Sequence, residues 1–130
     1  MKEFAIKENH LFVKTYGKGK RYSGKTVGVY VLKDIKAGRL KKENPQKEYL
    51  NRLGFSASPK LGNAVKRNRC KRIMRAAYRD ILKKYVLRKG NLIVISARAG
   101  AVEAKSSEIF RELEKAFSGL GLISGKIDSV

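Results

Sequence analysis

Apolar residues recur along the chain with two different spacings, and each spacing predicts one kind of element. Alternation, or a short unbroken apolar run, is typical of strands and marks residues 26–32, 50–57 and 91–97. A spacing of three and four residues is typical of helices and marks residues 8–16, 64–86 and about 106–118. The pattern also allows a short strand near residues 20–23. Helices that alternate with a small sheet predict an α+β fold, built as a two-layer α/β sandwich.

The length of 130 residues fits one domain that spans residues 1–130. We expect its core over about residues 8–118. Residues 33–48 are polar and basic, which predicts a loop, and the tail 119–130 is expected to fray. No apolar run approaches the roughly 18 residues that a membrane helix needs, and no secretory signal is expected. The single cysteine, Cys70, fits a reducing cytoplasm.

The charge of the chain points to a partner. There are 31 lysines and arginines against 11 acids, which gives a net charge of +20. Because such an excess repels itself in the folded state, it implies a polyanionic partner. Nucleic acid is the first candidate, and an anionic membrane surface is the second. A cationic surface that serves solubility alone is the remaining alternative.

The long helix concentrates this charge, because residues 60–79 contain basic residues and no acid. One side of the predicted helix is apolar and is formed by Cys70, Ile73, Met74, Ala77 and Ile81. The opposite side, which we call the basic stripe, is formed by Asn68, Lys71, Arg72, Arg75 and Arg79. At the standard helical rise the stripe is about 16 Å long. It fits the phosphates of a nucleic acid, although a solvated charged surface is the simpler alternative.

Three positions near the start of this helix need separate interpretation. Asn63 is a good N-cap, and the free N–H groups that follow it could bind an anion, with simple capping as the alternative. Arg69 flanks the basic stripe. Arg67 falls at the apolar border, where a long side chain can lie along the protein and reach solvent with its tip.

Several sequence blocks resemble the protein component of bacterial ribonuclease P. They are Arg52-Leu53-Gly54-Phe55-Ser56, Lys60-Leu61-Gly62-Asn63-Ala64-Val65, Arg67-Asn68-Arg69 and Lys71-Arg72. The N-terminal part is similar too, with Phe12, Tyr16, Gly19, Lys20 and Arg21 at the family's spacing, then a strand with Tyr30. The likeness covers about residues 8–118. It implies the order α-β-β-β-α-β-α, with the basic helix in a left-handed βαβ crossover, against the general rule.

The resemblance also implies a function, that of the accessory protein subunit of a tRNA 5′-processing endonuclease. Its partners would be the ribonuclease P catalytic RNA and precursor tRNA, with the catalytic centre and most of the Mg²⁺ held by the RNA. The residues facing the catalytic RNA would be Lys60, Asn63, Lys66, Arg67, Asn68, Arg69, Lys71, Arg72, Arg75 and Arg79. A cleft between the first helix and the sheet would bind the single-stranded 5′ leader through Phe12, Tyr16, Tyr30, Arg52 and Ser56. For Phe12, core packing is the alternative.

The residues themselves do not favour catalysis by the protein. A protein nuclease usually needs clustered carboxylates or a histidine pair, whereas His10 is the only histidine and the acids are scattered. Glu108 and Glu112 share a face of the last helix, where we expect them to be solvated. Cys70 lies on the apolar side of its helix, which predicts a buried thiol. We therefore expect no catalytic residue and no metal site in this chain.

Two other functions compete with the one that the resemblance implies. A ribosome-associated structural RNA-binding protein would share the charge and the fold class, and only the spacing of the motifs separates it. A protein that binds a membrane surface is disfavoured, because the apolar side of the basic helix is needed for the core.

Overall fold

The computed structural model describes residues 4–6, 9–33 and 51–127, so the predicted loop 33–48 lies outside them except for Lys33. The helices in these residues are α1 (Asn9–Lys18), α3 (Ala64–Lys84) and α4 (Ser106–Gly119). The strands are β1 (Phe4–Ala5), β2 (Lys20–Ser23), β3 (Val27–Lys33), β4 (Arg52–Ala57), β5 (Tyr85–Leu87), β6 (Asn91–Ala97) and β7 (Ile123–Lys126). Short 3-10 turns span Pro59–Leu61 and Ala99–Ala101. The three predicted helices and the strands near 20–23, 26–32, 50–57 and 91–97 are confirmed.

The main sheet has the strand order β1-β4-β6-β3-β2. Its central strand is β6, which pairs parallel with β4 and antiparallel with β3. Four consecutive residues of β6, from Leu92 to Ile95, are buried. This continuous burial explains the unbroken apolar run in the sequence, because helices cover both faces of the sheet at its centre.

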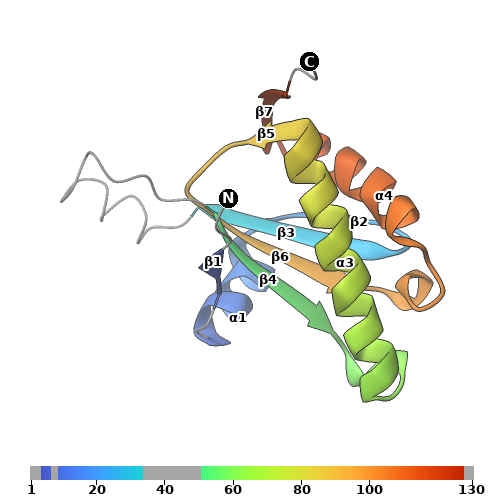
Figure 1. The fold of residues 1–130 in the computed structure, drawn as a ribbon. Helices are drawn as coiled ribbons and strands as arrows, with labels where there is room; N and C mark the ends of the chain where they lie inside the picture. Colours follow the sequence, from blue (N-terminus) through green and yellow to red (C-terminus); the bar gives the residue numbers. More distant parts are fainter. Residues whose placement is uncertain (1–3, 7–8, 34–50, 128–130) are drawn as a thin grey trace.

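The connection from β4 to β6 passes through α3 and is left-handed (Figure 1). Nearly all βαβ units have the opposite hand. The crossover agrees with the fold that the resemblance implied, and so does the order of the elements apart from the additional strands β1, β5 and β7. As a result, α3 lies beside α4 on one face of the sheet, while α1 packs on the other face.

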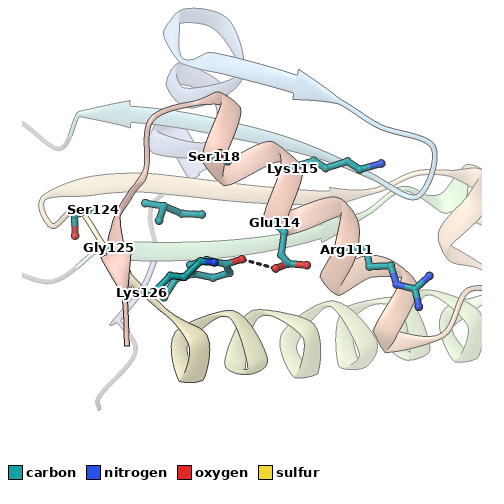
Figure 2. A pocket seen from close by; sticks show the side chains of 9 residues that line it. Arg111, Glu114, Lys115, Ser118, Ser124, Gly125 and Lys126 are labelled. Atoms are coloured by element: carbon teal, nitrogen blue, oxygen red, sulfur yellow. Dashed lines mark hydrogen bonds between the residues drawn. The ribbon is translucent and has the colours of Figure 1, made fainter. Parts of the chain in front are cut away.

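The C-terminal tail forms a strand, so the prediction that it frays is wrong for its described part. β7 pairs antiparallel with β5 in a second, two-stranded sheet, beside the end of α4 (Figure 2). The turn between α4 and β7 is anchored by Leu122, which is buried and whose N–H donates to the carbonyl oxygen of Phe117 at 2.9 Å. Pairing with β7 also makes Tyr85–Leu87 a strand, which is why α3 ends at Lys84 and not at the predicted residue 86.

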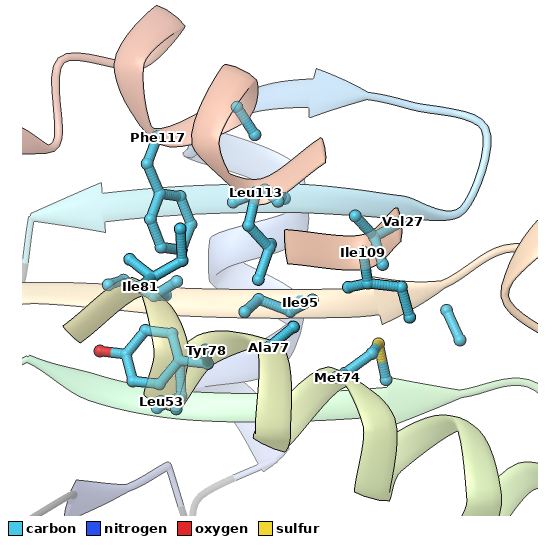
Figure 3. Close-up of a cluster of buried hydrophobic side chains, with 14 of the residues drawn as sticks. Val27, Leu53, Met74, Ala77, Tyr78, Ile81, Ile95, Ile109, Leu113 and Phe117 are labelled. Carbon is cyan, nitrogen blue, oxygen red and sulfur yellow. The ribbon is translucent and has the colours of Figure 1, made fainter. Parts of the chain in front are cut away.

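The main core lies between the sheet and the two helices α3 and α4 (Figure 3). From α3 it receives Cys70, Met74, Ala77, Tyr78 and Ile81, and from α4 it receives Ile109, Leu113, Ala116 and Phe117. Burial of one large apolar side chain contributes about 1.5–3 kcal/mol. The predicted apolar side of the basic helix is therefore confirmed, and Cys70 is a buried thiol as expected.

A smaller cluster lies on the other face of the sheet, under α1. The buried members are Ile6, Leu92 and Val94. β3 serves both clusters by alternation, as its sequence predicts: Val29 faces the main core, whereas Tyr30 faces α1. The two faces of the sheet thus differ in burial: the face under α3 and α4 carries the larger core, whereas the face under α1 carries partly exposed aromatic rings.

Candidate nucleic-acid interface

The start of α3 is fixed by hydrogen bonds of the local chain. Asn63 has an extended backbone, and its Oδ1 accepts the N–H of Lys66 at 3.0 Å. Before it, Ser58 Oγ accepts the N–H of Lys60 at 3.2 Å and caps the short 3-10 turn. Gly62 joins the turn to the helix with φ at 134°, a conformation that favours glycine. The predicted cap at Asn63 is confirmed, and it places Lys60 and Lys66 on the surface.

The basic stripe lies on the solvent side of α3, opposite the core. Asn68, Arg72, Arg75 and Arg79 are exposed, and Lys71 is half-buried. Within the described ranges, no carboxylate forms an ion pair with the stripe. The acid that follows it on α3, Asp80, lies 4.0 Å from the ammonium of Lys83. The described part of the chain therefore leaves the charge of the stripe without a counter-ion.

Two arginines of the predicted RNA-facing set make contacts within the protein, and a third, Arg67, is half-buried. Arg69 donates from Nη1 to the carbonyl oxygen of Val102 at 2.6 Å and from Nη2 to that of Ala104 at 3.1 Å. The guanidinium of Arg75 lies over the ring of Phe55, at 5.3 Å from its centroid. Arg67 is half-buried, and its Nε is buried without a hydrogen-bond partner in the described residues. Arg69 thus braces the segment before α4, while Arg75 keeps an exposed face.

The predicted cleft residues gather on the α1 face of the sheet. The rings of Tyr16 and Tyr30 meet edge to face, with centroids 4.7 Å apart. The hydroxyl groups of Tyr16 and Ser56 lie 2.7 Å apart, and Ser56 Oγ donates to Ser96 Oγ at 3.1 Å. Arg52 lies on the same face of β4 as Ser56, four residues along the strand. The structure therefore brings α1, β3 and β4 together at one half-exposed aromatic surface.

Two glycines shape this surface by leaving room for side chains. A Cβ at Gly54 would lie 2.4 Å from Cζ of Phe12, so the ring of Phe12 rests directly on β4. The partial burial of Phe12 beside Ile6 means that both interpretations hold: it packs in the small cluster and keeps part of its ring exposed. A Cβ at Gly28 would lie 3.3 Å from Nε of Arg98.

Comparison with known proteins decides the family. The sequence profile of the family Ribonuclease P matches residues 1–121. The chain belongs to the ribonuclease P protein family. The ribonuclease P protein component of Clostridium acetobutylicum is 34% identical over 123 residues, which cover 95% of this chain and 93% of that protein. The same component of Symbiobacterium thermophilum is 32% identical over 122 residues, which cover 94% and 95%.

Solved structures of ribonuclease P proteins share the fold. The Staphylococcus aureus RNase P protein superposes with a TM-score of 0.69 at 28% identity, covering 95% of this chain and all of that one. The Thermotoga maritima RNase P protein superposes with a TM-score of 0.64 at 22% identity, covering 85% and 92%. The resemblance drawn from the sequence blocks is confirmed. The chain is a ribonuclease P protein subunit, which implies a part in tRNA processing and association with the RNase P RNA.

The acids of this ribonuclease P protein make contacts that the sequence did not predict. Glu112 is half-buried, and its Oε1 accepts the N–H groups of Thr26 and Val27, each at 3.0 Å. The expectation that Glu112 is solvated is wrong, because the turn between β2 and β3 presents these two N–H groups to α4. Glu108, one turn earlier, is exposed as expected.

A second carboxylate, Glu114, joins α4 to the end of α3. It accepts hydrogen bonds from the hydroxyl of Tyr85 and from the ammonium of Lys84, the latter at 3.0 Å. The hydrogen bond from Tyr85 is the main cause that holds the pKa of Glu114 below its ordinary value. The same bond raises the pKa of Tyr85, and the bond to Glu114 raises the pKa of Lys84.

The described residues offer no cluster of three histidine, cysteine, aspartate or glutamate side chains that could hold a metal ion. No helix among them is both long and apolar enough to cross a membrane.

One residue of the aromatic surface was missed by sequence reasoning. Arg98 donates from Nη2 to Ser23 Oγ at 3.0 Å, and its guanidinium lies beside Gly28. Alternation along β6 could have found it, because Ser96 and the residue two places on share a face. Arg98 brings a positive charge to the sheet face that carries Tyr30.

Proposed function

We propose that this chain binds the catalytic RNA of ribonuclease P through α3 and the 5′ leader of precursor tRNA through the aromatic surface under α1. The observation that carries the proposal is the basic stripe, which has no carboxylate counter-ion in the part of the chain that is described. RNA phosphates supply that counter-ion, and the release of their condensed cations drives binding. Arginine forks suit phosphate oxygens in particular.

The cleavage chemistry belongs to the RNA in this proposal. Mg²⁺ acts there, bound mainly through RNA phosphates, since it keeps much of its water and prefers phosphate and carboxylate oxygens. The protein lowers the need for Mg²⁺ by neutralising part of the phosphate charge. It works in the cytoplasm as an accessory subunit, away from membranes.

The aromatic surface supports a role in binding single-stranded RNA. Tyr16 and Tyr30 are half-exposed, and their edge-to-face contact holds both rings in place. Bases stack on such rings with little sequence preference, for roughly 1–3 kcal/mol each. Arg52 and Arg98 lie on the same face of the sheet, where they can meet the phosphates of the leader.

Reconstitution tests the whole proposal. The protein is mixed with a bacterial ribonuclease P RNA at low Mg²⁺, and cleavage of a precursor tRNA is followed. We expect cleavage to be restored, and to depend less steeply on Mg²⁺ than with the RNA alone. The protein should also tighten binding of the leader-bearing precursor more than that of mature tRNA. Co-purification with ribosomal subunits, together with no effect on cleavage, would instead favour a structural RNA-binding protein of the ribosome.

A variant of Tyr30 tests the leader surface separately. Tyr30→Ala removes one ring, so the preference for leader-bearing substrate should fall by about 5- to 150-fold. Tyr30→Phe keeps the ring and is the matched control. If Tyr30→Ala weakens leader-bearing and leaderless substrates equally, the leader surface is assigned wrongly.

A further inference from the structure

A groove of about 650 Å³ runs between α4 and β7, at the end of the molecule where α3 stops (Figure 2). Its floor includes the ring of Tyr85 and the side chain of Ile123. Arg111 and Lys115 border it on the α4 side, and Lys126 borders it on β7. Neither the basic stripe nor the aromatic surface contributes a residue to this groove.

The three cations at the groove form no ion pair within the described chain, although Lys126 lies near enough to Glu114 to help lower the pKa of that carboxyl. Arg111, Lys115 and Lys126 are exposed, and none forms an ion pair with a described carboxylate. The carboxylate of the groove, Glu114, already accepts hydrogen bonds from Lys84 and Tyr85. Three positive charges therefore face one negative charge that is neutralised by a neighbouring lysine, and the site favours an anion.

The shape and lining of the groove favour a nucleotide over a simple ion. Tyr85 and Ile123 provide an apolar floor on which a ribose or an unpaired base can lie. The cations border the groove at separate points, where successive phosphates of such an RNA can lie (Figure 2). The cations come from α4 and β7, which follow each other in the chain, whereas Tyr85 of β5 comes from a distant segment. The groove therefore depends on the pairing of β5 with β7 and not on a local run of basic residues.

We propose that this groove is a second RNA-binding site, which holds an unpaired stretch of RNA with its backbone passing along Arg111, Lys115 and Lys126. The inference rests on the proposed function, because it takes RNA as the partner. The position of the groove supports the proposal: the basic stripe ends at Arg79, α3 ends about 7.5 Å further along at Lys84, and Tyr85 follows directly. An RNA that lies along α3 reaches the groove at the helix end.

A charge-matched pair of variants tests the site. The groove variant carries Arg111→Gln, Lys115→Gln and Lys126→Gln. The control carries Lys25→Gln, Lys33→Gln and Lys105→Gln, which are exposed residues outside both proposed RNA-binding surfaces and the groove. Binding of the full chain to ribonuclease P RNA is measured from low to high salt. We expect the slope of log K against log salt to fall by roughly 0.7 for each phosphate of a single strand that the groove variant no longer neutralises.

Two arms identify which RNA occupies the groove. A smaller slope for binding to the catalytic RNA alone assigns the groove to that RNA. A smaller slope only for binding of leader-bearing precursor to the assembled holoenzyme assigns it to the precursor. If the groove variant matches the control in both arms, the inference is wrong.

A local probe gives a second measurement that does not depend on charge. The chain contains no tryptophan, and Ser118 is an exposed residue of α4 that lines the groove. Ser118→Trp therefore places a single indole at the site. We expect its emission to change when RNA binds and to recover in high salt. Unchanged emission, while filter binding shows the complex, would overturn the inference.

These outcomes are distinguishable from failure of the proposed function. The wild-type protein tests that function through restored cleavage and preference for the leader. If the wild type succeeds and the groove variant behaves like its control, only the second site is lost. If the wild type fails, the proposed function is wrong whatever the groove variant does.

Discussion

α3 and α4 lie side by side on one face of the sheet and bury similar apolar sides, yet they use charge in opposite ways. The carboxylates of α4 bind groups of the protein itself: Glu112 holds two backbone N–H groups and Glu114 holds Tyr85 and Lys84. The outer side of α3 presents arginines without a carboxylate partner among the described residues.

This difference separates the charges that stabilise the fold from the charges that no described carboxylate neutralises. Like charges three and four residues apart weaken a helix by a few tenths of a kcal/mol per pair. α3 bears that cost, and its packing against the sheet offsets it. Variants on the two helices should therefore separate stability from RNA affinity.

The largest effect on stability is expected at Glu112. Glu112→Ala leaves the N–H groups of Thr26 and Val27 without their acceptor, which should lower the free energy of unfolding by about 2–3 kcal/mol. Urea denaturation measures this. Glu108→Ala, an exposed change on the same helix, is the control and should stay within about 0.5 kcal/mol. Equal effects of the two variants would mean that the contact of Glu112 contributes little.

A variant of Arg69 tests whether this residue of α3 stabilises the fold or contacts RNA. Because its guanidinium spans two carbonyl oxygens, Arg69→Ala should destabilise the protein by about 1.5–2 kcal/mol. Arg69→Lys should recover little, since an ammonium cannot reproduce the fork. The salt dependence of RNA binding should change less for Arg69→Ala than for Arg72→Ala. A large change in salt dependence with unchanged stability would make Arg69 an RNA contact instead.

The periodicity of the sequence predicted the helices and most strands, because each buries a regular face of its own. The apolar side of α3 and the alternation of β3 follow directly from the residues. The left-handed crossover came only from the resemblance, since no local pattern sets the hand of a connection.

What local patterns could not predict depends on contacts between distant segments. β5 and β7 are short, and each forms a strand because the other pairs with it. The carboxylate of Glu112 meets Thr26 and Val27, about 85 residues away in sequence. In the candidate site, the sequence identified the basic residues, but only the structure separates Arg69, which braces the fold, from the exposed Arg72.

The contact of Tyr85 with Glu114 should stabilise the protein in a pH-dependent way. Tyr85→Phe removes the hydroxyl and should cost about 0.5–1 kcal/mol at pH 7, a small value because the pair is partly exposed. The lowered pKa of Glu114 means that its contribution is present above the unfolded pKa of about 4 and is lost as the pH falls. The raised pKa of Tyr85 means that the contribution is also lost above about pH 10.

Denaturation at several pH values measures the free energy of unfolding of the wild type and of Tyr85→Phe. The difference between the two free energies should be largest near neutral pH and should shrink in acid and in strong base. Ser124→Ala changes the two-stranded sheet of β5 and β7 without altering Tyr85 or Glu114, and it serves as the control. A difference that stays constant from about pH 2 to 7 would show that the carboxylate is not the group that matters.

The smallest expected effect on stability is an increase, at Arg72. It gives the sharpest test of the difference between α3 and α4. Arg72 has Arg69 and Arg75 as neighbours three residues away on α3, and it makes no contact in the described structure that a glutamine would lose. Arg72→Gln should therefore raise the free energy of unfolding by a few tenths of a kcal/mol without RNA. The same variant should weaken RNA binding and reduce its salt slope by somewhat under one unit. A variant that gains stability and loses RNA affinity is expected only if the positive charge of α3 serves to bind RNA. If Arg72→Gln destabilises the free protein and leaves RNA binding unchanged, its charge serves the fold, and the contrast between the two helices does not hold.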